Sequence, residues 1–190
     1  ALWTKLRELA VDPDSAVRYQ LAFTLGEVRN PERLAAMASI ARQEAGSAWM
    51  RAALLSSLAE GAGELFTVLS GDPVFRATEA GQEFLRQLTA LVGAKNSATE
   101  VDAVLAYLGQ LNEPALAFSM TSALDEGLQR ARASLAKTGG SVAAILMRAA
   151  KAADDGALPE AARVPAVRLL AHLPYAEAGK RLIALLDQSQ

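Results

Sequence analysis

Few side chains in this sequence are suited to catalysis or metal binding. His172 is the only histidine and the chain has no cysteine, which excludes disulfides, thiolate metal sites and cysteine nucleophiles from these residues. As a general base, His172 would need a nucleophile and an orienting carboxylate, and no residue at a fixed spacing supplies them. We expect His172 to face solvent at the end of a helix, near the negative end of the helix dipole.

Paired acids and glycine turns are the remaining patterns that could carry chemistry. Adjacent helical residues such as Asp125-Glu126 and Asp154-Asp155 point about 100° apart and do not converge on one atom, so we interpret both pairs as solvated helix ends and loops. Gly61-Ala62-Gly63 lacks the following Gly-Lys-Ser/Thr and the preceding strand of a phosphate-binding loop, and Gly139-Gly140-Ser141 follows Lys137-Thr138 in the wrong order, so both turns are predicted to stop helices. The sequence therefore predicts no catalytic residue, metal ligand or cofactor, and does not favour a small-molecule ligand.

Arginine and tryptophan side chains form the one candidate interaction surface, which consists of Arg18, Trp49, Arg51 and Arg168. The arginines follow an apolar residue in three similar runs, and they could line a surface for an acidic partner. The favoured interpretation is a ladder of Asp and Arg between neighbouring repeats. Trp49 could anchor a binding partner, or it could cover the loop after Gly46.

Helices are the elements that must position these residues. Apolar residues make up 52% of the chain and aromatic residues only 5%, and the apolar positions repeat every three or four residues between Gly, Pro, Asn and Asp breakers. Asp12-Pro13-Asp14-Ser15 offers an N-cap. The spacing predicts a short apolar turn at 65–69, a long helix at 114–135, a last helix near 176–187, and helices whose apolar stripes span 2–9, 17–28, 34–41, 50–58, 80–91, 101–111, 142–149 and 164–173.

Self-similarity indicates that these helices form a repeat. A shift of 33 residues places Val17-Arg18 on Met50-Arg51, and Leu21 and Leu25 on Leu54 and Leu58. A third copy of this core is predicted at 167–171. We expect an all-α superhelix of about five helix pairs plus one unpaired helix. We expect residues 1–190 to be a single repeat domain, and, because helical spacing begins at once, a fragment of a longer protein.

The run DPDSAVRYQLAFTLGEV, at residues 12–28, resembles the second helix of a HEAT repeat. That pattern has an Asp in the turn, then Val-Arg, then small residues and Leu at helical spacing, which here are Asp12 or Asp14, Val17, Arg18, Ala22 and Leu25. The resemblance is strong at residues 12–60, weaker at 158–187 and weakest in the middle third. It implies an α-α solenoid of the HEAT or armadillo type.

A narrower resemblance concerns the run from Val17 to Leu58. It is similar to the HEAT segment of PVC-type haem-binding proteins, labelled membrane-bound dehydrogenases, which join a propeller, HEAT repeats and a c-type haem domain. The resemblance implies an exported or periplasmic redox parent with this chain as a helical spacer or docking module. No Cys-x-x-Cys-His occurs in the chain, so no haem ligand or dehydrogenase residue can be assigned to it.

Function is therefore expected to lie in contacts rather than in catalysis. The leading hypothesis is a non-enzymatic scaffold that binds another protein or neighbouring domains of its parent chain. A nucleic-acid-binding HEAT-like module is a second hypothesis, which the net charge of −2 disfavours. A bilin-lyase-like HEAT protein is a third. No apolar stretch is long enough to cross a membrane, so no membrane insertion by this segment is expected.

Overall fold

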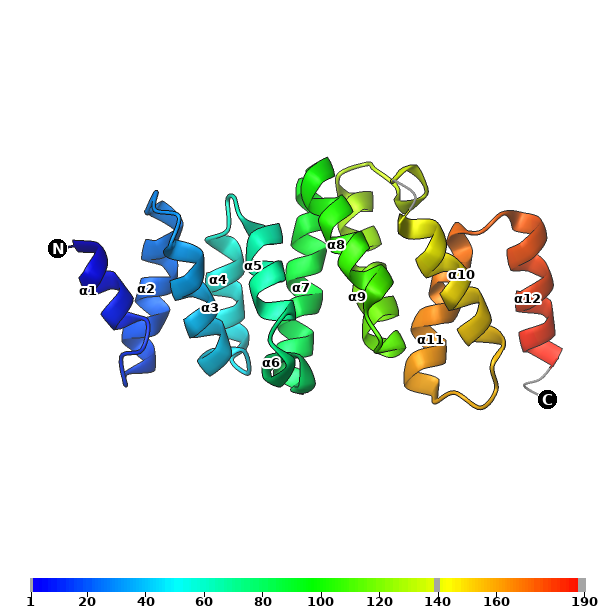
Figure 1. The fold of residues 1–190 in the computed structure, drawn as a ribbon, viewed down its shortest axis with the longest axis horizontal. Helices are drawn as coiled ribbons and strands as arrows, with labels where there is room; N and C mark the ends of the chain where they lie inside the picture. Colours follow the sequence, from blue (N-terminus) through cyan, green and yellow to red (C-terminus); the bar gives the residue numbers. More distant parts are fainter. Residues whose placement is uncertain (1, 139–140, 188–190) are drawn as a thin grey trace. The chain divides into compact units, whose positions relative to one another are not determined.

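The chain is all-helical in the part that the structure describes. The computed structural model describes residues 2–138 and 141–187, and its regular elements are α-helices and short 3-10 helices (Figure 1). In chain order they are α1 (Leu2–Leu9), α2 (Ser15–Glu27), α3 (Arg33–Glu44), α4 (Ala48–Ser56), α5 (Ala62–Ser70), α6 (Pro73–Ala77), α7 (Glu79–Lys95), α8 (Ala98–Gln110), α9 (Pro114–Arg130), η1 (Leu135–Lys137), α10 (Ser141–Asp154), α11 (Glu160–Leu169), η2 (Leu170–His172) and α12 (Tyr175–Asp187). The all-α class is confirmed, whereas the predicted stop at Gly139-Gly140 lies outside the described residues.

The chain divides into two compact units, Ala1–Leu91 and Val92–Gln190, and the division falls within α7. In the first unit, α2 packs on α1, α3 and α4, and α3 packs on α4 and α5. Each of these helices therefore contacts its neighbour in the chain and also the next helix but one. The apolar stripes of the sequence make these contacts, since Leu21, Leu25, Leu54 and Met37 are all buried.

The second unit repeats the same contact pattern. Successive helices α8 and α9 pack together, as do α10 and α11, and in addition α8 packs on α10 and α9 on α11. Phe118, Leu124, Leu128 and Ile145 are buried in this unit. In both units, therefore, helices pack on their neighbour in the chain and on the next helix but one.

In the first unit, side chains cap the N-termini of α2, α4 and α6. Asp14 accepts a hydrogen bond from the Ala16 N–H at 2.8 Å and caps α2, as the sequence predicted. Ser47 caps α4 in the same way, and Asp72 caps α6 by accepting from the N–H groups of Val74 and Phe75 at 3.1 Å. These bonds satisfy amide groups that have no partner within the helix.

The helix bounds differ from the predicted ones, most clearly in two segments. The predicted turn at 65–69 is part of α5, a nine-residue helix, and α6 follows it without having been predicted. The helix predicted at 114–135 ends at Arg130 because Arg132 adopts a left-handed conformation with φ of 58°. Leu135 then belongs to η1. Spacing of apolar residues does not detect such turns, because Leu135 is buried and remains in register with the preceding stripe.

Candidate functional site

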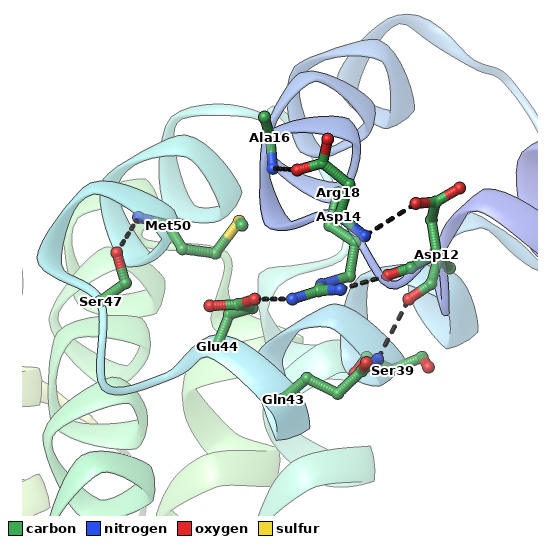
Figure 2. Close-up of polar contacts among 10 residues, drawn as sticks. Asp12, Asp14, Ala16, Arg18, Ser39, Gln43, Glu44, Ser47 and Met50 are labelled. Carbon is green, nitrogen blue, oxygen red and sulfur yellow. Dashed lines mark hydrogen bonds and ion pairs between the residues drawn. The ribbon is translucent and has the colours of Figure 1, made fainter.

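Arg18 is the most deeply buried of the candidate interaction residues. It is the fourth residue of α2, and only 9% of its surface is exposed. Its guanidinium donates to the Asp12 backbone oxygen and forms an ion pair with Glu44 at the end of α3 (Figure 2). Gln43, beside Glu44, donates to the Ala10 backbone oxygen at 3.1 Å. Arg18 therefore links the start of α2 to the end of α3 and is not available as a surface group.

Three further arginines occupy the same position in other helices. Arg51 is the fourth residue of α4 and donates to the Ala45 backbone oxygen at 2.7 Å and to that of Gly46 at 3.2 Å. Arg76 of α6 donates to the Ser70 oxygen at 2.6 Å, and Arg163 of α11 donates to the Ala153 oxygen at 3.4 Å. A charged donor at this position satisfies a carbonyl group at the end of the preceding helix, which has no partner within that helix.

Arg168 does not belong to this set. It lies in the last turn of α11 and is exposed, so the predicted third copy of the repeat core at 167–171 is wrong. Arg163 is the equivalent residue, because it is the fourth residue of its helix as Arg18 and Arg51 are of theirs. Counting residues from the start of each helix would have identified Arg163. Searching the sequence for an apolar residue followed by Arg selected Arg168 instead.

Ion pairs between carboxylates and arginines link different helices, but the residues that form them are not those of the predicted ladder. Asp12 and Asp14 bond to backbone N–H groups, and the acidic partner of Arg18 is Glu44. A second pair joins Arg42 of α3 to Asp72, with Nε 2.8 Å from Oδ2. The hydrogen bond from Arg42, followed by that from the Phe75 N–H, lowers the pKa of Asp72.

Trp49 lies on the surface, unlike Arg18, which is buried. It is the second residue of α4, and 77% of it is exposed. Val74, the second residue of α6, is 76% exposed. On α2, Phe23 is 41% exposed and packs edge-to-face on Tyr19, with ring centroids 5.2 Å apart. These three exposed side chains, Phe23, Trp49 and Val74, are called the apolar surface set below.

The candidate residues are therefore only partly brought together. Arg18, Trp49 and Arg51 lie in the first unit, where α2 packs on α4, and Arg168 lies in the second. Two of the four are used in internal contacts, and Trp49 remains the exposed member in the first unit.

His172 differs from its predicted environment. Its side chain is only 15% exposed, and its Nε2 lies 3.1 Å from Oδ2 of Asp125, whose side chain is 9% exposed. Gln129 donates to the same Oδ2 at 2.5 Å. The expectations of a solvent-facing histidine and of a solvated Asp125 are wrong, because α9 and η2 bring together residues far apart in the sequence. The His172–Asp125 pair joins η2 to α9. The sequence interpretation overlooked that Asp125 falls on the buried face of its helix.

The other paired acids lie at helix ends, as the sequence predicted. Asp154, the last residue of α10, forms an ion pair with Arg181 of α12, and Asp155 accepts from the Ala157 N–H at 3.0 Å. Gly61, at the predicted stop, has φ of +84° and precedes α5. Local contacts at helix ends therefore account for both the Asp154-Asp155 pair and the glycine turn at Gly61.

Two adjoining hollows lie where α2 and α4 end. One has a volume of about 380 Å³ and is lined by residues of α2 and α4, among them Phe23 and Glu27. The other has a volume of about 690 Å³ and extends over the loops that follow these helices, past Arg29 and Glu60. Both are lined by Gly26, Glu27 and Ala59. We call the two hollows together the α2–α4 trough.

Comparison of the chain with protein-family models, with curated proteins and with solved structures gives no match. Within residues 2–138 and 141–187, no group of three or more His, Cys, Asp or Glu side chains is placed to hold a metal ion. In the same residues, no helix has both the length and the hydropathy needed to cross a bilayer.

Proposed function

We propose that this chain is a HEAT-type helical repeat scaffold without catalytic activity, which binds another protein or a neighbouring domain of a longer parent chain. The apolar surface set carries the proposal. Phe23, Trp49 and Val74 are exposed in a unit whose recurrent arginines are used in internal contacts. Exposed aromatic and aliphatic side chains held on packed helices are typical of protein-binding surfaces.

The HEAT assignment is supported by two features of the repeat. In both compact units, helices pack on their chain neighbour and on the next helix but one, as expected of α-solenoids. The arginine that follows an apolar residue near the start of the second helix recurs with the same backbone acceptor, six residues earlier, at Arg18, Arg51 and Arg76. This recurrence gives the Val-Arg element of the sequence pattern a structural role.

A photo-crosslinking amino acid at position 49 tests this function. In cells that make the natural protein, we expect crosslinks from position 49 to one reproducible partner or to a distinct segment of the parent. A probe at Glu160, which is exposed and lies in the second unit, is the control. Absence of any crosslink at position 49, or the same background from both probes, would count against the scaffold.

The identity of the parent rests on the narrower resemblance alone. An exported redox protein of the PVC-type haem-binding kind would have a propeller before this segment and a Cys-x-x-Cys-His haem site after it. Sequencing the coding region on both sides of the segment tests that proposal. Flanking sequence without either feature would remove the redox parent, and it would leave the scaffold proposal intact.

A further inference from the structure

A hollow lies between α1 and α2, which pack on each other (Figure 1). Its volume is about 360 Å³, and apolar side chains of both helices line it, among them Leu6, Leu9, Val17 and Leu21. On each helix these residues are three or four positions apart, so they lie along one face. The hollow, called the α1–α2 groove below, is therefore lined by one apolar face of each helix.

The repeat shows which kind of element fits this face of α2. A shift of 33 residues places Gln20 on Ala53 and Thr24 on Ser57. Gln20 is exposed and Thr24 is half-buried, whereas Ala53 and Ser57 are buried. α2 packs on α4 so closely there that a Cβ on Gly26 would lie 2.9 Å from the Ser57 Cβ. The groove is thus the position where one more helix would pack on α2 as α2 packs on α4.

α12 is the helix that exposes a matching apolar face. Four of its large apolar side chains are exposed, namely Tyr175, Leu182, Ile183 and Leu186. Their spacing of i, i+7, i+8 and i+11 places them on one side of the helix. Ala178 lies off this stripe and is buried, and α12 packs on η2. Every other helix in the described part of the chain has at most one exposed large apolar side chain.

The size of this face suits a weak but specific contact between two copies of the chain. α12 has 13 residues, so it is about 20 Å long and about 10 Å wide. Seating one side of such a helix in a groove removes on the order of 1,000 Å² of surface from water, counted over both partners, which is the lower limit for a specific interface. We expect a dissociation constant of roughly 10–100 µM for a contact of this size.

We propose that α12 of one copy of this chain lies in the α1–α2 groove of a second copy. Leu182 and Ile183 would contact the apolar lining of the groove. The contact is heterologous, because the two copies contribute different surfaces. Each copy can therefore bind one neighbour through its groove and another through α12. This self-association does not use the apolar surface set and is separate from the proposed scaffold function.

Sedimentation equilibrium of the full chain and of two variants tests the proposal. The α12 variant carries Ile183→Lys and Leu186→Lys, and the groove variant carries Ala16→Lys and Gln20→Lys. All four positions are exposed, so we expect each variant to stay folded, with a loss of less than about 1 kcal/mol. Circular dichroism checks the fold, and Ser replaces Lys at the same positions in any variant that is not helical.

A third variant, with Val74→Lys and Met147→Lys, is the control, because it places the same charge at exposed apolar positions elsewhere. We expect the average mass of the natural chain and of the control to rise above that of the monomer between about 10 and 200 µM. The α12 variant and the groove variant should each associate at least about tenfold more weakly.

An equimolar mixture of the α12 variant and the groove variant is the decisive sample. We expect it to form a dimer and nothing larger, because the intact α12 of one variant can occupy the intact groove of the other, while the two altered surfaces repel each other. A mixture that remains monomeric would refute the contact.

Two further results would overturn the proposal. One is a natural chain that is monomeric up to about 200 µM. The other is a folded α12 variant or groove variant that still associates as the control does, since association would then use another surface. Crosslinking from position 49 measures the scaffold function separately, so either proposal can fail while the other stands.

Discussion

At the scale of residues, the recurrent arginines stabilise the junctions between helices. Each one donates from the first turn of its helix to a backbone carbonyl near the end of the preceding helix. This role leaves other side chains to carry the proposed binding function. It also separates Arg51, which is held in place, from Arg168, which is exposed.

Substitutions of Arg51 and Arg168 test whether Arg51 is held in internal hydrogen bonds while Arg168 is exposed. We expect Arg51→Met to lower the free energy of unfolding by about 1.5–3 kcal/mol, because two charge-assisted hydrogen bonds to carbonyls are lost. Arg168→Met should change it by less than about 0.5 kcal/mol. Urea denaturation of both variants measures the difference. Equal losses would show that the internal role of Arg51 is misassigned.

The His172–Asp125 pair is expected to matter for stability. His172→Leu removes one of the two side chains that contact the Asp125 carboxylate and leaves Gln129 as the other, and we expect a loss of about 3 kcal/mol because this carboxylate is almost fully buried. His172→Leu combined with Asp125→Leu should recover part of this loss, because the buried carboxylate is then absent. Chemical denaturation of both variants measures the two effects. A urea midpoint of His172→Leu equal to that of the natural chain would contradict the contact.

Asp72 provides a prediction about pH. Its pKa is lowered in the folded chain, first by the hydrogen bond from Arg42. A lowered folded-state pKa means that the group contributes stability above its unfolded pKa of about 4, and that this contribution is lost as the pH falls through the folded value.

Asp72→Asn removes the negative charge of residue 72 but retains an oxygen able to cap α6. A comparison of this variant with the natural chain therefore measures the contribution of the charge. We expect the natural chain to be more stable than Asp72→Asn by a constant amount above about pH 5, and the difference to vanish at more acidic pH. Urea midpoints measured between pH 2 and 7 test this expectation. A difference independent of pH would mean that the carboxylate is not held by Arg42.

At the scale of elements, apolar spacing predicted which segments are helices better than where they end. The Leu21–Leu25 and Leu54 stripes are buried in α2 and α4, as their period of three to four residues indicated. The spacing overextended the helix that ends at Arg130 and missed α6, because Arg132 and the Asp72 cap act through backbone conformation and hydrogen bonding. The ends of the helices therefore could not be predicted from apolar spacing and were obtained from the structure.

Close packing of α7 and α9 depends on a glycine. A Cβ on Gly93 would lie 2.2 Å from the Leu124 backbone oxygen, whereas one on Gly109 would have only the Ile145 Cγ1, at 3.9 Å. We expect Gly93→Ala to cost about 1–3 kcal/mol because the backbones must move apart. Gly109→Ala, within α8, should be neutral or stabilise by up to about 1 kcal/mol. Thermal denaturation compares them, and a Gly93→Ala variant as stable as Gly109→Ala would refute the close contact.

At the scale of the whole molecule, the composition and the apolar spacing predicted the all-helical class. The sequence did not predict the division at Leu91–Val92, because that depends on which distant residues touch rather than on local pattern. The candidate surface was only partly predicted. Trp49 is exposed, whereas the pairing of His172 with Asp125 and the trough at the ends of α2 and α4 depend on contacts between elements.

The most direct measurement is the affinity of the chain for the partner identified by crosslinking, with and without the apolar surface set. A variant carrying Phe23→Ser, Trp49→Ser and Val74→Ser should keep its stability within about 1 kcal/mol, because all three side chains are exposed. We predict that it binds the partner at least about tenfold more weakly. An unchanged dissociation constant in this folded variant would contradict the proposal that the chain is a scaffold that binds through these helices.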